Sequence, residues 1–303
     1  MYAVVTMRRR VRRVVDRVLR AWGYERPPVA PVDLSERALG PLEALRRADG
    51  RRVIVSVPMD SLRTLAPLGF PLRQNAKHPY VETARQWVTG RHTAYVGSAL
   101  WAYYDAVQPR NGAEVLGSGG LFRGSRLESM TPIETAYPWS RAPGPSVERH
   151  RRRWVRGDAT EHDVERGRTL AWPTVGPMSL EDGEFGFSRI VHLVESVSST
   201  GFDPDGRGAG YVTGTVLHDA SAFAVTVGGG QHRVAVLAAL GHVTVPVVLQ
   251  PRRLVARTSV SEWPGVRSGA FSVEQALAVF DRLLRGGLPA CVPEAWCGDA
   301  PPG

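Results

Sequence analysis

The chain has two cysteines and one lysine among its 303 residues. Both cysteines, Cys291 and Cys297, lie near the end of the sequence, so the pattern differs from the disulfide framework of a small secreted protein. No run of apolar residues approaches the ~18 that a transmembrane helix requires. The arginine-rich start is not followed by the apolar stretch of a secretory signal. These features favour a cytoplasmic protein.

The net charge of +9 is concentrated at one end of the chain. Residues 1–26 contain eight arginines and two carboxylates, which gives +6 and leaves only +3 for residues 27–303. A domain that recognises nucleic acid usually presents a basic face. The charge distribution therefore argues against specific binding of nucleic acid.

Residues 7–22 form a basic amphipathic pattern within the first segment. Apolar residues recur at spacings of three and four and so share one helix face, while arginines occupy much of the remainder. The helix either packs on the body through its valines or lies at an interface. In the second case, residues 7–22 would make peripheral contact with an anionic membrane or an acidic protein.

Composition and turn residues divide the chain into five segments. The predicted order is a basic helix over 1–26, a mixed, mostly helical α/β region over 36–146, a charged linker over 147–170, a second α/β domain over 171–288 and a loose tail over 289–303. Within the first α/β region we expect a strand at Arg52–Val57 and a loop over Pro109–Gly124. Whether that strand joins the sheet of the second domain is left open.

The most informative pattern lies in residues 221–249. An apolar, partly β-branched strand, Ser221–Val227, is followed by Gly228, Gly229 and Gly230, then by helical spacing and by a second strand, Val243–Leu249. A glycine-rich turn that opens a helix presents free N–H groups and the positive end of the helix dipole, which together suit a phosphate. His232 and Arg233 on the first helical turn add side-chain donors.

These residues resemble the signature of the ParB/sulfiredoxin-like fold. The turn Gly229-Gly230-Gln231-His232-Arg233 and the strand Val245-Pro246-Val247 carry the resemblance, which covers residues 175–250 together with a preceding helix over 184–200. The resemblance implies an α/β (α+β) fold with a mixed sheet and flanking helices. It also implies a nucleotide-phosphate site made by Gly228, Gly229, Gly230, Gln231, His232 and Arg233.

Departures from the family pattern narrow the implied function. Gln231 stands where sulfiredoxin carries its catalytic cysteine, so sulfinic-acid reduction is not expected. Gly229 stands where the kinases of the family carry an aspartate. Only about fifty residues follow Val248, which leaves no room for the usual helix-turn-helix domain of the partition proteins.

The resemblance favours an ATP-dependent phosphotransferase (kinase) that acts on a small molecule in a bacterial biosynthetic pathway. ATP or another nucleotide and Mg²⁺ would be the cofactors, and the sequence offers no closed set of metal ligands of its own. His232 and Glu184 are the predicted catalytic residues, with Asp182 and Glu195 in reserve. Glu184 would orient or deprotonate the acceptor, although it is equally suited to a simple helix-dipole role.

Two alternatives to the kinase stay open. One is a non-catalytic switch gated by CTP or ATP, which tolerates the missing aspartate, and the other is a DNA-associated ParB-like protein.

The sequence also predicts where individual helices begin. Ser188 is the expected N-cap of the helix before Gly201, and Ser272 with Gln275 forms a capping box that opens a helix over Val273–Arg285.

The two interpretations of residues 7–22 predict different results. An interfacial helix makes the protein sediment with anionic liposomes, less so as salt is added, and a variant that lacks residues 1–26 does not sediment. A helix packed on the body instead makes that deletion lower the melting temperature, with no effect of liposomes on either protein. Co-sedimentation and thermal unfolding of the two proteins decide between them.

Overall fold

A computed structural model describes most of the chain after the basic N-terminal segment. The described residues are 30–72, 77–117, 119–161, 172–204, 210–220 and 222–297. The predicted basic helix at 1–26 and the end of the predicted charged linker lie outside them. Within these ranges, no helix has the length and apolar character needed to cross a bilayer.

The described strands form one mixed sheet of eight strands in the order β1-β2-β7-β5-β6-β3-β4, with β8 paired to β5. Their bounds are β1 Val32–Asp33, β2 Val53–Pro58, β3 Leu62–Thr64, β4 Phe70–Pro71, β5 Val212–Asp219, β6 Ala222–Gly229, β7 Thr244–Leu249 and β8 Leu254–Ala256. The predicted α/β class with a mixed sheet and flanking helices is confirmed at this level.

Strand β5 is the centre of the sheet. One of its edges pairs antiparallel with β6, and its other edge pairs in parallel first with β7 and then with β8. Beyond these neighbours, β2 runs antiparallel to β7 and β3 runs parallel to β6. The strand predicted at Arg52–Val57 therefore joins the sheet that contains the glycine turn. Strands on both sides of residues 147–170 share one sheet and one hydrophobic core.

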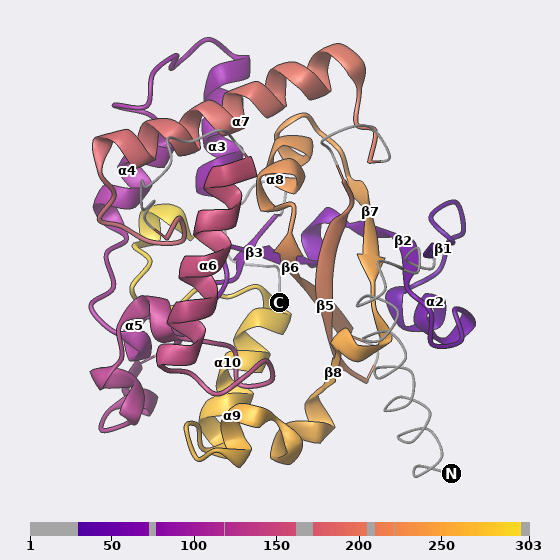
Figure 1. Ribbon diagram of the computed structural model, residues 1–303, viewed down its shortest axis with the longest axis vertical. Coiled ribbons are helices and arrows are strands. Elements are labelled where there is room, and N and C mark those ends of the chain that lie inside the picture. Colours follow the sequence, from indigo (N-terminus) through magenta and orange to yellow (C-terminus); the bar gives the residue numbers. More distant parts are fainter. Residues whose placement is uncertain are drawn as a thin grey trace, which may run out of the picture.

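Helices surround this sheet (Figure 1). Their bounds are α2 Pro41–Arg47, α3 Pro79–Val88, α4 Ala99–Ala106, α5 Gly112–Leu116, α6 Pro145–Glu161, α7 Leu180–Thr200, α8 Gln231–Ala239, α9 Pro264–Arg267 and α10 Val273–Arg285. Short 3-10 turns are η1 Met59–Ser61, η2 Gly119–Phe122, η3 Arg126–Ser129, η4 Pro132–Glu134, η5 Pro251–Arg253, η6 Arg257–Glu262 and η7 Glu294–Trp296.

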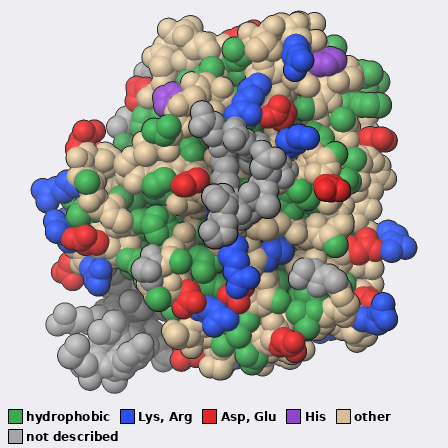
Figure 2. Space-filling model, turned by 180° about the vertical axis from the view of Figure 1, so that it is seen from behind, with side chains coloured by type: hydrophobic (Ala, Val, Ile, Leu, Met, Phe, Trp, Pro, Cys, Tyr) green, Lys and Arg blue, Asp and Glu red, His purple; other side chains and the backbone are tan. Residues whose placement is uncertain are grey.

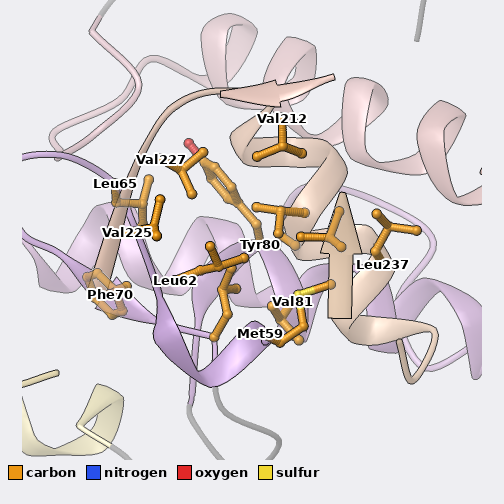
Figure 3. Packing of buried hydrophobic residues seen from close by; sticks show 14 of the residues in the cluster. Met59, Leu62, Leu65, Phe70, Tyr80, Val81, Val212, Val225, Val227 and Leu237 are labelled. Atoms are coloured by element: carbon orange, nitrogen blue, oxygen red, sulfur yellow. The ribbon is translucent and has the colours of Figure 1, made fainter. Parts of the chain in front are cut away.

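The buried hydrophobic residues form two large clusters. The long helix α7 crosses one end beside α3 and α8, whereas α9 and α10 lie at the other end (Figure 1). Figure 3 shows Leu62, Val225 and Val227 of the sheet beside Tyr80 and Val81 of α3 in the larger cluster. The smaller cluster gathers aromatic rings under α10, among them Trp139, Trp263 and Phe280. Burial of such side chains supplies most of the stability of a fold of this size.

One local signal is confirmed by cap geometry: the predicted capping box between Ser272 and Gln275 opens α10. Ser98 caps α4 by accepting from the Trp101 N–H. The N-cap predicted for the long helix α7, Ser188, is wrong. The N-cap is Ser179, nine residues earlier, whose hydroxyl accepts from the Asp182 N–H. Ser188 lies within the helix, and its hydroxyl donates to the Glu184 carbonyl.

Three segments predicted to be irregular have structure. The predicted loop Pro109–Gly124 contains α5, which Asn111 caps. Residues 147–161 of the predicted charged linker belong to α6, and Val147 and Val155 are buried. The described part of the tail packs on the body, where the Trp296 ring meets Tyr103 edge to face at a centroid distance of 5.6 Å. A few apolar anchors thus order segments whose composition is mostly polar.

The start of α7 can be tested with two serine variants. Ser179→Ala removes the hydroxyl that accepts from the Asp182 N–H, so the free energy of unfolding should fall by about 0.5–2 kcal/mol. Ser188→Ala is the matched control and should leave stability unchanged or slightly higher, because alanine favours a helix interior. Urea unfolding of both variants measures the difference. A larger loss for Ser188→Ala would contradict the start of α7 at Ser179.

Candidate functional site

Only one of the three glycines predicted to form the turn before α8 does so. Gly228 and Gly229 end β6 and are extended, so the prediction that all three glycines form the turn is wrong. Gly230 alone turns the chain, with φ +84° and ψ 27°, and serves as the N-cap of α8. Because glycine has no side chain, no side-chain oxygen caps the first-turn N–H groups of α8. This leaves an uncapped, positive helix end at the edge of the sheet.

Close packing also requires glycine at this corner. A Cβ atom on Gly230 would lie 3.3 Å from the Cα and Cγ2 atoms of Val212, in a left-handed conformation that other residues rarely adopt. A Cβ atom on Gly229 would lie 3.0 Å from the Thr213 hydroxyl, and one on Gly228 would lie 3.2 Å from an Arg253 Nη1 atom. The glycines therefore let β5 and an arginine approach the start of α8.

Gln231 fastens this corner to the N-terminal half of the chain. Its Oε1 atom accepts a 2.8 Å hydrogen bond from the backbone N–H of Leu65, which follows β3. The amide side chain is thus occupied by a structural contact between residues 166 positions apart. Gln231 lies at the predicted phosphate turn, but its side chain links the start of α8 to the residue that follows β3.

His232 lies against an aromatic ring. Its imidazole and the Tyr80 ring have centroids 4.6 Å apart at an interplanar angle of 31°, and the Tyr80 hydroxyl donates to the Pro173 carbonyl. The half-buried histidine thus borders the first turn of α8 with one face covered by Tyr80. Helix α3 therefore contributes to the candidate site through a residue that sequence reasoning did not select.

Arg233 folds back over the turn. Its Nη1 atom donates to the Gly210 carbonyl, just before β5. Burial, and to a lesser extent the neighbouring Arg189 guanidinium of α7, lowers the pKa of Arg233. Arg253 approaches the same corner at Gly228. Arg189 and Arg233 therefore repel one another beside the start of α8, and this repulsion falls when an anion lies between them, whereas Arg253 lies beside the end of β6.

Glu184 lies elsewhere on the surface. Its exposed side chain is near the beginning of α7, where burial of the Tyr95 phenol and then the charge of Glu184 raise the pKa of Tyr95. The structure brings together Gly230, His232 and Arg233, but it gives no contact between Glu184 and these residues. The reserve residues are also on α7, with Asp182 in its first turn and Glu195 exposed near its other end.

Arg189 and Arg253, like Tyr80, are residues that sequence reasoning missed. Each lies in a segment with its own local pattern, and no spacing in the sequence connects either of them to the glycine turn. They reach the site because α7 packs on α8 and because the η5 turn follows β7. Among the described residues, no group of three or more His, Cys, Asp or Glu side chains is arranged to hold a metal ion.

The described surface also lacks the feature expected of a nucleic-acid interface on the face shown in Figure 2. Lysine and arginine side chains there alternate with aspartate and glutamate side chains, without a continuous basic field.

Comparisons with protein-family models, curated proteins and solved structures gave no match for this chain. The candidate site therefore rests on its geometry.

A buried histidine beside the site has a structural role. His78 caps α3: its Nδ1 atom accepts from the Tyr80 N–H at 3.1 Å, and its Nε2 atom lies 2.5 Å from the Thr64 hydroxyl. Since Nδ1 accepts, the proton is on Nε2 and the ring is neutral. Burial lowers the pKa of His78 from 6.5 to about 3. His78 thus holds α3, and with it Tyr80, against β3.

This histidine predicts a loss of stability in acid. Between pH 6.5 and about 3 the unfolded chain binds a proton at His78 that the folded chain does not, so stability is present above pH 6.5 and falls below it. The slope should approach ~1.4 kcal/mol per pH unit. His78→Asn keeps a capping acceptor without a titrating ring, so its unfolding free energy should fall less steeply. Parallel slopes for the two proteins would contradict a buried, neutral His78.

Proposed function

We propose that the protein binds a nucleotide, with the phosphates at the N-terminus of α8. The observation that carries the proposal is the uncapped first turn of α8, with Arg233 on that turn and the Arg189 guanidinium near it. Free N–H groups at a helix start bind anions, and arginine adds charge-assisted, bidentate contacts to phosphate oxygens. Because Arg233 is half-buried, these contacts are stronger than they would be in bulk water.

The arrangement around α8 also supports membership of the ParB/sulfiredoxin-like fold, which we propose for this chain. The order of β6, Gly230, α8 and β7 is the one that the resemblance implies, and α7 packs beside α8 as the preceding helix of that pattern. A nucleotide is the ligand that this resemblance favours. Any Mg²⁺ would arrive with the nucleotide, because the described residues gather no carboxylate cluster at this turn.

Binding without phosphoryl transfer fits the geometry better than a kinase does. Phosphoryl transfer to a hydroxyl uses a carboxylate beside the phosphates to position or deprotonate the acceptor. Glu184 instead lies against Tyr95, and the described neighbours of Arg233 are the Gly210 carbonyl and Arg189. We therefore favour the nucleotide-gated switch. The ATP-dependent phosphotransferase stays a prediction, and the same preparation tests it.

Arg233→Ala should weaken nucleotide binding about ten- to a hundredfold, because it removes a charge-assisted contact to phosphate. Arg267→Ala is the control: it removes an exposed arginine on α9, at the other end of the molecule (Figure 1), and should leave affinity unchanged. Isothermal titration with ATP, CTP, GTP and ADP in the presence of Mg²⁺ measures both. Equal affinities for the wild type and Arg233→Ala, or no binding of any nucleotide, would overturn the proposal.

ATP consumption with pooled small-molecule acceptors then separates a switch from a kinase. The switch hypothesis expects no acceptor-dependent consumption above the buffer rate in the wild type. Acceptor-dependent turnover that falls about a hundredfold in Glu184→Gln, with nucleotide affinity intact, would instead establish the phosphotransferase with Glu184 as its base. Turnover that is unchanged in Glu184→Gln would remove Glu184 from the mechanism.

A further inference from the structure

A second group of arginines lies away from α8, between α6, α10 and the segment that follows η4. Arg63, Arg151 and Arg282 all act electrostatically on the hydroxyl of Tyr137. They come from β3, α6 and α10, so only the tertiary structure brings them together. The glycine turn uses none of these residues.

The positive charge of this group is not balanced by a buried acid. No aspartate or glutamate is among the buried side chains of the described residues. Arg151 donates to the carbonyls of Ile133 and Pro132, and Arg282 donates to those of Leu68 and Gly287. Burial lowers the pKa of Arg151 and of Arg282 to about 10, so both remain charged near neutral pH. Buried charges usually have a counter-charge.

The neighbouring ionisable groups cannot provide that counter-charge. Burial raises the pKa of Tyr137 well above its usual range, despite the three arginines that oppose the shift. Burial likewise raises the pKa of the Cys291 thiol, which lies near Arg282, to about 12. Both groups are therefore neutral at pH 7, and the described hydrogen bonds of Arg151 and Arg282 go to backbone carbonyls.

Two polar atoms within this group lack a hydrogen-bond partner. The Tyr137 hydroxyl is buried without a hydrogen-bond partner, and the residue as a whole is only 8% exposed. The Nε–H of Arg282 is also buried without an acceptor. Buried polar groups of native proteins are nearly always satisfied, and an unmade bond costs about 1–3 kcal/mol. The Arg282 Nε–H can only donate and the Tyr137 hydroxyl can donate, so a single kind of ligand group, a hydrogen-bond acceptor, satisfies both.

The ring of Tyr137 is held in place independently of its hydroxyl. It stacks on Trp139 at a centroid distance of 4.9 Å and an angle of 14°. The guanidinium of Arg151 lies 4.1 Å from the centroid of the Trp172 ring, which fixes its position as well. Arg151 and Arg282 keep part of their side-chain surface in solvent, whereas the Tyr137 hydroxyl and the Arg282 Nε–H are themselves enclosed. The two unsatisfied donors therefore lie inside the protein, beside guanidinium groups that reach its surface.

We propose that Tyr137, Arg151 and Arg282 form a binding site for a small oxyanion, a phosphate or carboxylate group, separate from the nucleotide site at α8. An oxyanion would accept from the Tyr137 hydroxyl and the Arg282 Nε–H and would neutralise the guanidinium charges. Arg282 also binds the carbonyls of Leu68 and Pro67. Gln231 holds Leu65 at the other end of this turn, so residues 65–68 lie between the two sites.

Tyr137→Phe tests the site, because it removes the unpaired hydroxyl and keeps the stacked ring. The parent protein for this test carries Arg233→Ala alone, and the test variant adds Tyr137→Phe to it. Any phosphate bound at α8 then contributes equally to the melting temperatures of both proteins. Melting temperatures are recorded in low-salt buffer with increasing inorganic phosphate or, separately, acetate. We expect the parent to be stabilised and Tyr137→Phe to need about ten- to a hundredfold more anion for the same shift. Without added anion, Tyr137→Phe should be at least as stable as its parent.

Tyr104→Phe is the matched control, since its buried hydroxyl donates to the Pro173 carbonyl. This variant should lose stability but keep the full response to the anion. A shift with phosphate alone would identify a phosphate group, and a shift with acetate as well would extend the site to carboxylates. Identical responses of Tyr137→Phe and its parent, no response of either, or a Tyr137→Phe variant that is destabilised without anion would overturn the proposal. The result does not depend on nucleotide binding at α8.

Discussion

The pairing of β5 along both of its edges is the constraint on which the rest of the structure depends. Its antiparallel partner β6 leads into Gly230, and its parallel partner β7 receives the chain after α8. Helix α8 must therefore cross β5, and its first turn lies over Val212 and Gly210. The close approach of Gly230 to Val212 follows from this crossing. Without it, the open helix end and Arg233 would not lie beside Val212 and Gly210.

Arginine carries much of the long-range connection in this protein. Arg63 is almost fully buried, and its guanidinium donates to the carbonyls of Leu283 and Leu284 at the end of α10. A guanidinium has five donors in a planar fork, so one side chain can cap a helix end and join it to a strand 220 residues away. Arg63 thus joins β3 to the end of α10 through backbone carbonyls.

How far the sequence predicts this fold depends on the range of the interaction. The capping box at Ser272 is local and was predicted correctly, because both partners lie within four residues. The cap at Ser188 was wrong because Ser179, Ser188 and Gly183 are all compatible with helix starts or interiors, and packing decides among them. A Cβ atom on Gly183 would lie 2.0 Å from the Tyr95 ring, which shows how closely the early part of α7 packs on distant residues. The glycine turn was located correctly, but pairing with β5 drew two of its glycines into β6.

Local signals in the sequence predicted the class of the fold, the strands and helix around Gly230, and the position of His232 and Arg233 on the first helical turn. These follow from periodicity, turn residues and caps, which act over a few positions. The long-range arrangement came from the fold: β2 joins the same sheet, Glu184 lies near Tyr95, Arg189 lies near Arg233, and three arginines act on Tyr137. The physical reason is that side-chain charge and packing act through space, between residues whose separation along the chain carries no periodic signal.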